Sequence, residues 1–338
     1  SGQTVSARTL IVTEPVLALM GPTASGKSAL AERLAETFEG ELISVDSALV
    51  YRGLSIGAAK PDYPHHLVHM REPHDPYTAA DFATDAKQCI DEIRGRGRRP
   101  ILVGGSMLYF RALIQGLDDI PAIDPAIRAD IEAEAQRYGW PALHQQLSEI
   151  DPETAGRLHP NHSQRICRAL EVYRGTGTPL SGWQQGNPAP TSDDYECIAL
   201  CPENRAVLHA RITKRLDAMF DQGLVAEVTR LHEQESLHTD LPAIRAVGYR
   251  QVWSYLEGEI DLSTCREKVL AATRQLAKRQ LTWLRGWPDL TWIWTDEAGQ
   301  LIGRGDPAAD AADSNGHGLS APVDGIWFDR LQQLMRNF

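Results

Sequence analysis

The sequence predicts an α/β protein in which a doubly wound parallel sheet carries an inserted all-helical domain. Strand-length apolar runs alternate with helical patterns between residues 16 and 117, as in a parallel sheet covered by helices. Residues 118–192 then show helical periodicity and no convincing strand pattern. A new apolar run begins at Tyr195, so we expect the chain to return to the sheet there.

A glycine-rich loop separates the first strand from the first helix. The apolar run Val16–Met20 suits a buried parallel strand, and Ala29, Leu30, Leu34 and Phe38 share one side of the helix that follows. The loop reads G-x-x-x-x-G-K-S and consists of Gly21, Pro22, Thr23, Ala24, Ser25, Gly26, Lys27 and Ser28. In this context backbone N–H groups converge on phosphate oxygens, Lys27 adds a charge, and the Ser28 hydroxyl is available to Mg²⁺. The motif predicts a P-loop NTPase-like core, but it does not identify the phosphorylated ligand.

The remaining elements follow in order along the chain. We expect strands at residues 41–46, 65–69, 100–105 and 195–201, and a helix from a cap at Thr78 to the basic turn at 94–99. Further helices are expected at residues 126–138, 141–147, 154–158, 163–173, 204–222, 263–285 and 326–334. Residues 298–319 are rich in Gly, Asp and Ala and are expected to be a linker or disordered. The predicted divisions are a core formed by 1–117 and 193–297, an inserted helical domain at 118–192, and a tail at 298–338.

Composition places the chain among cytoplasmic globular proteins. Its 338 residues contain five cysteines, which are scattered and form no paired C-x-x-C motifs, so we expect neither a zinc site nor a disulfide framework. No apolar run approaches the length of a membrane span, and Ser1–Thr4 do not resemble the start of a signal peptide. The net charge of −11 argues against nucleic-acid binding by the chain as a whole.

Two polar residues are expected at the carboxyl edge of the sheet, where ligands bind. Asp46 ends the second strand and is a candidate general base, substrate ligand or Mg²⁺ ligand; capping the next turn is the alternative. The third strand runs into Gly104 and Gly105 without the acid that usually holds Mg²⁺ in an ATPase, which argues against a nucleotide hydrolase. Ser106 follows, and its hydroxyl either faces the ligand, caps the next helix, or does both.

Basic residues are clustered in this acidic chain. Arg211 and Arg215 are four residues apart, so they share a helix face that either reaches a diphosphate or is simply solvated. Further clusters lie at residues 164–168 and 245–250, and along the late helix, which ends near Trp283 and Trp287. Three such runs with interleaved aromatic residues predict a groove that binds a polyanion. His65, His66 and His69 lack a partner at metal spacing, which favours structural roles.

Taken together, these motifs resemble the tRNA dimethylallyltransferase (tRNA isopentenyltransferase) family, over about residues 16–295. The resemblance is carried by residues 21–28, 46–51, 56–61, 65–67, 75–82, 164–170, 211–224 and 243–250. The chain departs from the family pattern at Met107, where members usually have glycine, and at His69, where they have aspartate. It also lacks the zinc finger of eukaryotic members, which fits a bacterial type.

The resemblance implies a reaction and a role for each motif. A dimethylallyl group would pass from dimethylallyl diphosphate to N6 of the adenosine 3′ to the anticodon (position 37), in tRNAs that read codons beginning with U. Lys27, Arg211, Arg215 and Mg²⁺ on Ser28 would hold the departing diphosphate. Asp46 would take the proton of the amine, and Ser106 would help to place the amine or the diphosphate. The adenine would be flipped into a channel between the core and the inserted domain.

The resemblance further implies partners for this chain. They are the tRNA anticodon stem-loop and dimethylallyl diphosphate, with no membrane and with the protein as a monomer. The residues implied to contact tRNA are Asp46, Ser47, Ala48, Leu49, Ser106, Arg128, Gln164, Arg165, Ile166, Cys167, Arg168, Arg245, Ala246, Val247, Gly248, Tyr249 and Arg250. Two other classes stay open at this point: a P-loop kinase of small molecules, which would bind ATP and an acceptor alcohol, and a non-enzymatic RNA-binding module. Retention of both Lys27 and Ser28 argues against the module.

Overall fold

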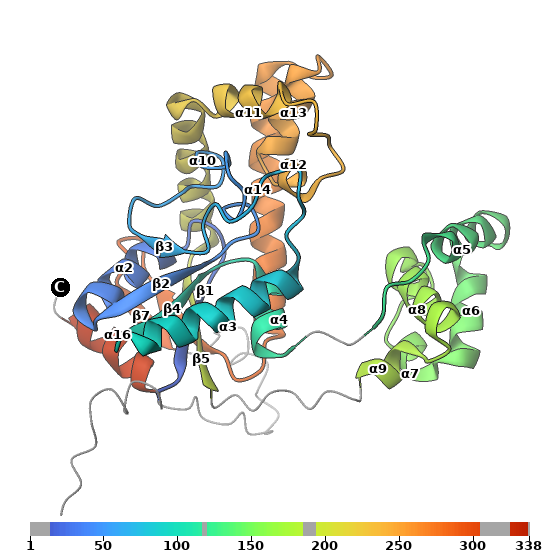
Figure 1. Cartoon of the computed structure of the whole chain (residues 1–338), viewed down its shortest axis with the longest axis horizontal. Coiled ribbons are helices and arrows are strands. Elements are labelled where there is room, and N and C mark those ends of the chain that lie inside the picture. Colours follow the sequence, from blue (N-terminus) through green and yellow to red (C-terminus); the bar gives the residue numbers. More distant parts are fainter. Residues whose placement is uncertain (1–13, 117–119, 185–193, 305–324, 337–338) are drawn as a thin grey trace, which may run out of the picture. The chain divides into compact units, whose positions relative to one another are not determined.

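The computed structural model describes residues 14–116, 120–184, 194–304 and 325–336 (Figure 1). The chain divides into two compact units, one formed by Ser1–Ile114 with Ser192–Phe338 and the other by Gln115–Thr191. Among the described residues, no helix is both long and apolar enough to cross a membrane.

The first unit is built on a seven-stranded sheet in the order β3-β2-β4-β1-β5-β6-β7, as far as the described residues define it. The strands are β1 (Val16–Met20), β2 (Gly40–Val45), β3 (His65–His66), β4 (Arg99–Gly104), β5 (Tyr195–Pro202), β6 (Thr291–Thr295) and β7 (Leu301–Arg304). All neighbours pair in parallel except β6 and β7, which are antiparallel. The predicted parallel sheet is therefore confirmed, with one antiparallel edge strand.

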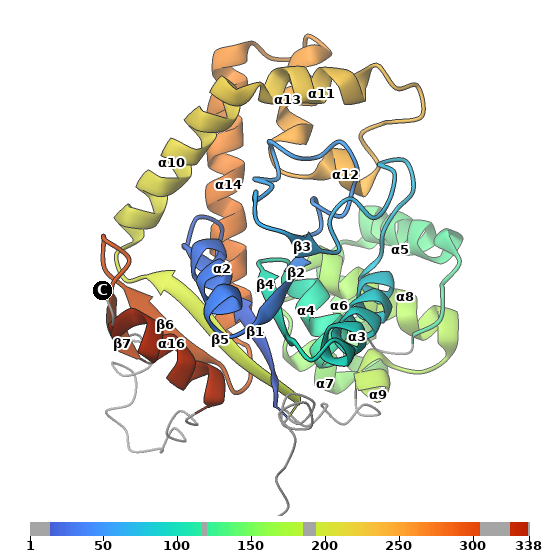
Figure 2. The same ribbon diagram turned by 60° about the vertical axis from the view of Figure 1, so that its left-hand side comes forward.

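Helices cover both faces of this sheet, because its central strands are apolar on both sides. The helices are α2 (Lys27–Thr37), α3 (Ala79–Gly95), α4 (Met107–Ile114), α10 (Arg205–Gln222), α11 (Leu224–His232), α12 (Pro242–Arg245), α13 (Tyr249–Leu256), α14 (Leu262–Arg285) and α16 (Ile326–Arg336). Leu17 and Leu19 of β1 pack with residues of α2 and α16. Ala18 and Met20 pack in the opposite core, with residues of α3, α4 and α14. Figure 2 shows that α10 and α14 extend beyond the sheet, and that α11 and α13 lie at the ends of these two helices away from the sheet.

The second unit contains helices and no strand among its described residues, 115–116 and 120–184. It contains α5 (Pro125–Tyr138), α6 (Trp140–Ile150), α7 (Pro152–Gly156), α8 (Ser163–Thr176) and α9 (Leu180–Gln184). Asp124 and Asp151 begin α5 and α7 by accepting backbone N–H groups, as capping carboxylates do. The core of the unit is formed by buried residues such as Ile131, Leu147 and Ile166.

Local predictions differ in how well they hold. Thr78 caps α3 in a capping box with Asp81, as predicted. Leu30 and Leu34 of α2 are buried as predicted, whereas Ala29 is exposed. The predicted strand at residues 65–69 stops after two residues because Leu67 and His69 have φ angles of 63° and 54°, which no strand adopts.

The prediction of a linker or disorder at residues 298–319 was wrong in part. Thr291–Thr295 forms the buried strand β6, and Leu301–Arg304, expected to be linker, pairs with it as β7. The short apolar pair of residues 301 and 302 is enough for an edge strand once β6 offers a partner. Residues 305–319 lie outside the described part of the chain, and the predicted terminal helix is present as α16.

Candidate active site

One cavity of about 520 Å³ lies within the first unit, at the carboxyl ends of β1, β2 and β4. The P-loop contributes Thr23, Lys27 and Ser28 to its lining. The loop after β2 contributes residues 46–49, and the turn after β4 contributes residues 104–109. The helices α10 and α14 contribute apolar side chains and two arginines: Ile212, Arg215, Leu216, Met219, Val269, Leu276 and Arg279.

The P-loop has the backbone that its glycines predict. Gly26 caps α2 with a φ angle of 93°, a conformation that side chains disfavour. A Cβ on Gly21 would lie 2.6 Å from the Leu200 carbonyl oxygen, so β5 packs directly against the loop. Lys27 Nζ donates to the Pro22 carbonyl over 3.1 Å. Removal from water, together with the nearby Arg215 guanidinium, lowers the pKa of Lys27 to about 8, and Asp46 offsets part of this effect.

One carboxylate oxygen of Asp46 accepts two hydrogen bonds, and the other accepts none from the described residues. Its Oδ1 accepts the N–H groups of Ala48 (2.8 Å) and Leu49 (3.0 Å), so the predicted turn cap is present. No described residue donates a hydrogen bond to Oδ2. Burial raises the pKa of Asp46, although the two amides and the nearby cations act in the opposite direction. A carboxylate that is held by one oxygen and raised in pKa is suited to accept a proton with the other.

Ser106 fixes the turn after β4 to the loop that carries Asp46. Its Oγ accepts the Ser47 N–H over 2.9 Å and donates to the Ser47 Oγ over 3.3 Å. A Cβ on Gly104 would lie 2.0 Å from the Val45 carbonyl oxygen, so only glycine permits this close approach of β4 to β2. Ser106 is thereby bound to the residue that follows Asp46, and both Asp46 and Ser106 line the cavity.

Arg215 and Arg211 lie on one face of α10, but they have different surroundings. Arg215 lines the main cavity, where its Nη1 donates to Thr23 Oγ1 over 3.1 Å. Arg211 instead lines a second cavity of about 380 Å³ behind the P-loop, together with Ala24, Ser25, Gly26 and also Arg215. Its Nη2 donates to the Glu297 carbonyl over 3.3 Å. A role for Arg211 in holding a diphosphate stays a prediction.

Residues 245–250 run from the last residue of α12 into the start of α13, and four of them line the main cavity. Arg245, Ala246, Val247 and Gly248 are in the lining, and the exposed Arg245 has no acidic partner among the described residues. Arg250 is exposed outside the lining. Tyr249 is fully buried, and its hydroxyl donates to Glu227 Oε2 over 2.8 Å. The side chain of Tyr249 therefore supports the segment from inside and does not face a partner.

Glu227 of α11 is a residue that the sequence motifs did not predict. It is 4% exposed, and its Oε1 accepts the N–H groups of Ser55 and Ile56, both over 2.9 Å. Its Oε2 accepts the Gly57 N–H (3.1 Å) as well as the Tyr249 hydroxyl. Glu227 thus connects two segments of the cavity wall. One begins at Gly57, and the other leads into α13 at Tyr249. The only sequence signal was a carboxylate among the buried positions of an amphipathic helix.

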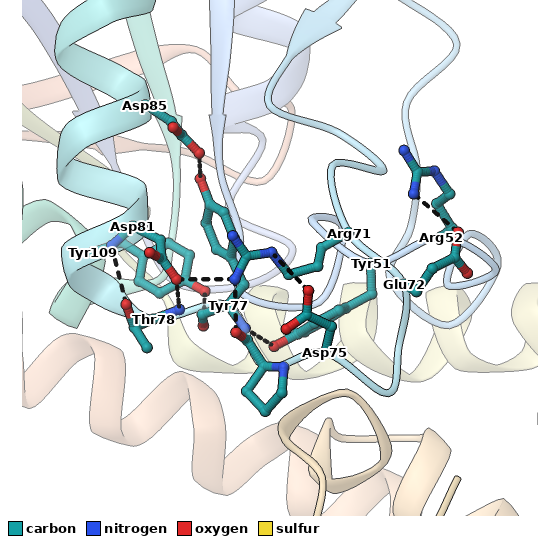
Figure 3. Close-up of polar contacts among 11 residues, drawn as sticks. Tyr51, Arg52, Arg71, Glu72, Asp75, Tyr77, Thr78, Asp81, Asp85 and Tyr109 are labelled. Carbon is teal, nitrogen blue, oxygen red and sulfur yellow. Dashed lines mark hydrogen bonds and ion pairs between the residues drawn. The ribbon is translucent and has the colours of Figure 1, made fainter. Parts of the chain in front are cut away.

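Another wall of the cavity rests on three buried tyrosines (Figure 3). Tyr109 lines the cavity and donates to the Tyr77 carbonyl over 3.4 Å. The Tyr77 N–H donates to the Tyr51 hydroxyl over 2.9 Å, and the Tyr77 hydroxyl donates to Asp85 over 2.6 Å. Arg71 lies over the Tyr77 ring and is held by ion pairs with two carboxylates. These contacts tie the wall together, and burial raises the pKa of Tyr109, so this wall adds no charge to the cavity.

The predicted RNA-contacting residues of the second unit divide into exposed and buried ones. Gln164, Arg165 and Arg168 are exposed on α8. Ile166 and Cys167 are 0% and 1% exposed and belong to the core of the unit, so their side chains face no partner. Arg128 of α5 donates to Gln164 Oε1 over 2.7 Å, and both Arg128 and Arg168 contact Glu171. One patch therefore carries the exposed arginines and the glutamine.

The histidines and cysteines have structural surroundings. His66 pairs with Glu41 over 2.8 Å, His65 bonds to the Tyr63 carbonyl, and His69 to the Leu54 carbonyl. All five cysteines are free and buried. Among the described residues there is no group of three or more His, Cys, Asp or Glu that would hold a metal ion.

Comparison with known proteins gives one consistent result. A family model described as IPP transferase matches residues 49–287. The chain is 51% identical over 308 residues to tRNA dimethylallyltransferase 2 of Hahella chejuensis, covering 85% of this chain and 92% of the relative. It is 56% identical over 280 residues to the tRNA dimethylallyltransferase of Thiobacillus denitrificans, covering 81% and 90%.

Solved structures agree with these relatives. The full-length tRNA isopentenylpyrophosphate transferase of Bacillus halodurans is 38% identical with a TM-score of 0.60, covering 83% of this chain and 90% of that one. A eukaryotic dimethylallyltransferase acting on tRNA is 26% identical with a TM-score of 0.69, covering 85% and 75%.

Proposed function

Because the chain belongs to the IPP transferase family, whose relatives are tRNA dimethylallyltransferases, we infer that it is a prenyl-transferring enzyme that modifies tRNA. The family predicted from the motifs, and its bacterial type, are thereby confirmed. The small-molecule kinase is the less supported alternative. We propose further that the donor is dimethylallyl diphosphate and the acceptor is N6 of adenosine 37, beside the anticodon.

The observation that carries the proposal is that one cavity joins three kinds of chemistry. Lys27, Ser28 and Arg215 supply groups for a diphosphate on one side. Asp46 and Ser106 supply a proton acceptor and a hydroxyl on another side. The apolar side chains of α10 and α14 between them suit a five-carbon prenyl chain, which gains from leaving water.

The donor side of the cavity stabilises the leaving group. As the bond between C1 of the prenyl group and the diphosphate oxygen breaks, that bond's electron pair goes to the diphosphate. Lys27 and Arg215, together with the amides at the start of α2, neutralise the charge that develops there. The pKa of Lys27, although lowered to about 8, leaves the amine mostly protonated at neutral pH, and a bound diphosphate favours the charged form further.

The acceptor side of the cavity removes one proton. The N6 amine of adenine attacks C1 of the prenyl group, and its nitrogen must then lose a proton. Asp46 Oδ2 faces no donor among the described residues and accepts that proton, while Oδ1 keeps the loop in place. Ser106, fixed to Ser47, orients the amine. The products are the prenylated adenosine, diphosphate and protonated Asp46.

A divalent cation, which we propose to be Mg²⁺, fits this site as a companion of the diphosphate. Ser28 lies in the first turn of α2, and its hydroxyl is exposed toward the same cavity. Since the described residues form no cage of metal ligands, the cation would be held by the Ser28 hydroxyl, phosphate oxygens and water, as is usual for Mg²⁺. When bound, it would supply positive charge to the leaving diphosphate.

Transfer to the anticodon loop requires contacts with RNA on both units. Arg245 at the cavity, and Arg165 and Arg168 on α8, are exposed cations suited to phosphate contacts. A stacked adenine is out of reach of the cavity, so the base must leave its stack to react.

Incubation with radiolabelled dimethylallyl diphosphate, Mg²⁺ and unmodified tRNA tests the proposal. The tRNA should become labelled, and replacing adenosine 37 by guanosine should abolish labelling. Absence of label with intact tRNA, under conditions in which the protein transfers the γ-phosphate of ATP to an alcohol, would overturn it in favour of the kinase.

A further inference from the structure

Gln280 of α14 connects two neighbouring segments of the cavity wall, the P-loop and the turn after β4, which follow the paired strands β1 and β4. Its Oε1 accepts the Thr23 N–H of the P-loop over 2.9 Å. Its Nε2 donates to the Gly105 carbonyl, in the turn after β4, over 3.0 Å. The side chain is 8% exposed, so these bonds are made away from bulk water. The three residues are far apart in the sequence, and only the fold brings them together.

Each segment that Gln280 holds carries reacting groups. Thr23 accepts a hydrogen bond from Arg215, which is placed to neutralise the leaving diphosphate. Gly105 precedes Ser106, whose hydroxyl fixes the Ser47 amide next to Asp46. A Cβ on residue 105 would lie 2.4 Å from Gln280 Nε2, so the glycine leaves room for this amide. A continuous set of contacts therefore runs from the diphosphate side through Gln280 to the proton-accepting side.

We propose that Gln280 is a positioning residue that sets the separation between the P-loop and the turn carrying Ser106, and thereby aligns the leaving group with the proton acceptor. The inference rests on the proposed prenyl transfer. Gln280 acts through Thr23 and Gly105 and takes no part in bond making. The Gln280 amide supplies the required acceptor and donor on one planar group at every pH. Alignment matters because a displacement of reacting atoms by about 1 Å costs on the order of 10²-fold in rate.

Two variants and a matched control test the proposal. Gln280→Ala removes both bonds. Gln280→Glu keeps the shape and the acceptor, but it can donate to the Gly105 carbonyl only when the new carboxyl is protonated. Gln275→Glu makes the same change at an exposed position of the same helix. The measurements are the single-turnover transfer rate, the dissociation constants for donor and tRNA, and the rate of each variant relative to the unaltered enzyme across pH.

We expect Gln280→Ala to slow single-turnover transfer about 10- to 100-fold, with both dissociation constants within about threefold of those of the unaltered enzyme. Gln280→Glu should be slowed similarly at high pH, and its relative rate should rise as the pH falls, because protonation restores the donor. The charged or titratable groups lining the same cavity are Lys27, Asp46, His65, Tyr109, Arg215, Arg245 and Arg279. They are present in both proteins, so the ratio isolates the new carboxyl. Gln275→Glu should match the unaltered enzyme at every pH.

Other results would overturn the inference. Unaltered transfer rates in both Gln280 variants, even with a lower melting temperature, would leave Gln280 with a role in stability alone. A relative rate of Gln280→Glu that does not change with pH would show that donation to Gly105 is not what matters, and this holds even if the alanine variant fails to fold. If the unaltered enzyme transfers no prenyl group, the proposed function fails and the inference fails with it.

Discussion

Replacing Asp46 by asparagine should stop prenyl transfer while leaving its loop in place. The asparagine Oδ1 can still accept the N–H groups of Ala48 and Leu49, so the turn is retained. The variant has no oxygen that can take the proton. Removing a general base costs about 10²- to 10⁴-fold in rate, or roughly 2.7–5.5 kcal/mol of activation free energy. We expect a loss in that range, with tRNA affinity changed by less than about twofold.

The dependence on pH has a definite sign. Asp46 must be ionised to accept a proton, and burial raises its pKa, so the activity of the unaltered enzyme should fall on acidification at a higher pH than an ordinary carboxylate would give. That acid limb should be absent from the residual activity of Asp46→Asn. Because folding raises this pKa, ionised Asp46 destabilises the folded state. The cost is absent below the ordinary carboxyl pKa and complete above the raised one. At neutral pH, Asp46→Asn should therefore melt no lower than the unaltered enzyme.

The assay is single-turnover transfer of label to tRNA, combined with filter binding and thermal melting. Asp62→Asn is the matched control, because it removes an exposed carboxylate from a nearby segment outside the cavity lining. The role of Asp46 as the base would be refuted if Asp46→Asn turned over at the unaltered rate. A loss of tRNA affinity as large as the loss of rate would likewise refute it, since Asp46 would then act in binding.

Three further predictions follow from the same geometry. Lys27→Ala removes a charge-assisted interaction with the diphosphate, so calorimetry should show donor binding weakened about 10- to 100-fold; an unchanged donor affinity would contradict this role. The double change of Arg165 and Arg168 to alanine should reduce the salt dependence of tRNA binding by about 0.7 in slope for each phosphate that is no longer neutralised; the exposed Arg137 serves as control, and an equal effect there would point to net charge alone. Glu227→Ala leaves three amides and a tyrosine hydroxyl without their buried acceptor, so denaturant titration should show a loss of about 3 kcal/mol or more; a loss below about 1 kcal/mol would show that water replaces the carboxylate.

Much of the site was predictable because its groups lie on short motifs with local geometry. The P-loop, Asp46 and Ser106 each follow a predicted strand directly, and parallel strands bring their carboxyl ends to one edge. Their chemistry could therefore be placed before the fold was known. The turn cap that was the alternative role of Asp46 is confirmed; it uses only Oδ1, so it is compatible with a role as base, which stays a prediction.

The residues that were missed act over long separations in the chain. Gln280 binds an amide 257 residues away, and Glu227 binds one 172 residues away. Local patterns hold no information on such pairs. The motifs also did not indicate that Ile166, Cys167 and Tyr249, which are predicted with their neighbours to contact RNA, have buried side chains. Their side chains are buried because an amphipathic helix must turn some residues of any motif toward the core.

The edge of the sheet was also poorly predicted, for a related reason. Strand β7 exists as a partner of β6, and a four-residue segment has too little apolar character to be recognised without that partner. The inserted helical unit was easier, since its helical periodicity is a local signal.

The most direct measurement is the mass spectrum of nucleosides from tRNA that has been incubated with the enzyme, dimethylallyl diphosphate and Mg²⁺. We expect one new nucleoside, an adenosine in which a dimethylallyl group replaces a hydrogen on N6, and we expect sequencing to place this adenosine at position 37. Unchanged nucleosides would contradict the proposed transfer, and so would a prenyl group on another base or on ribose.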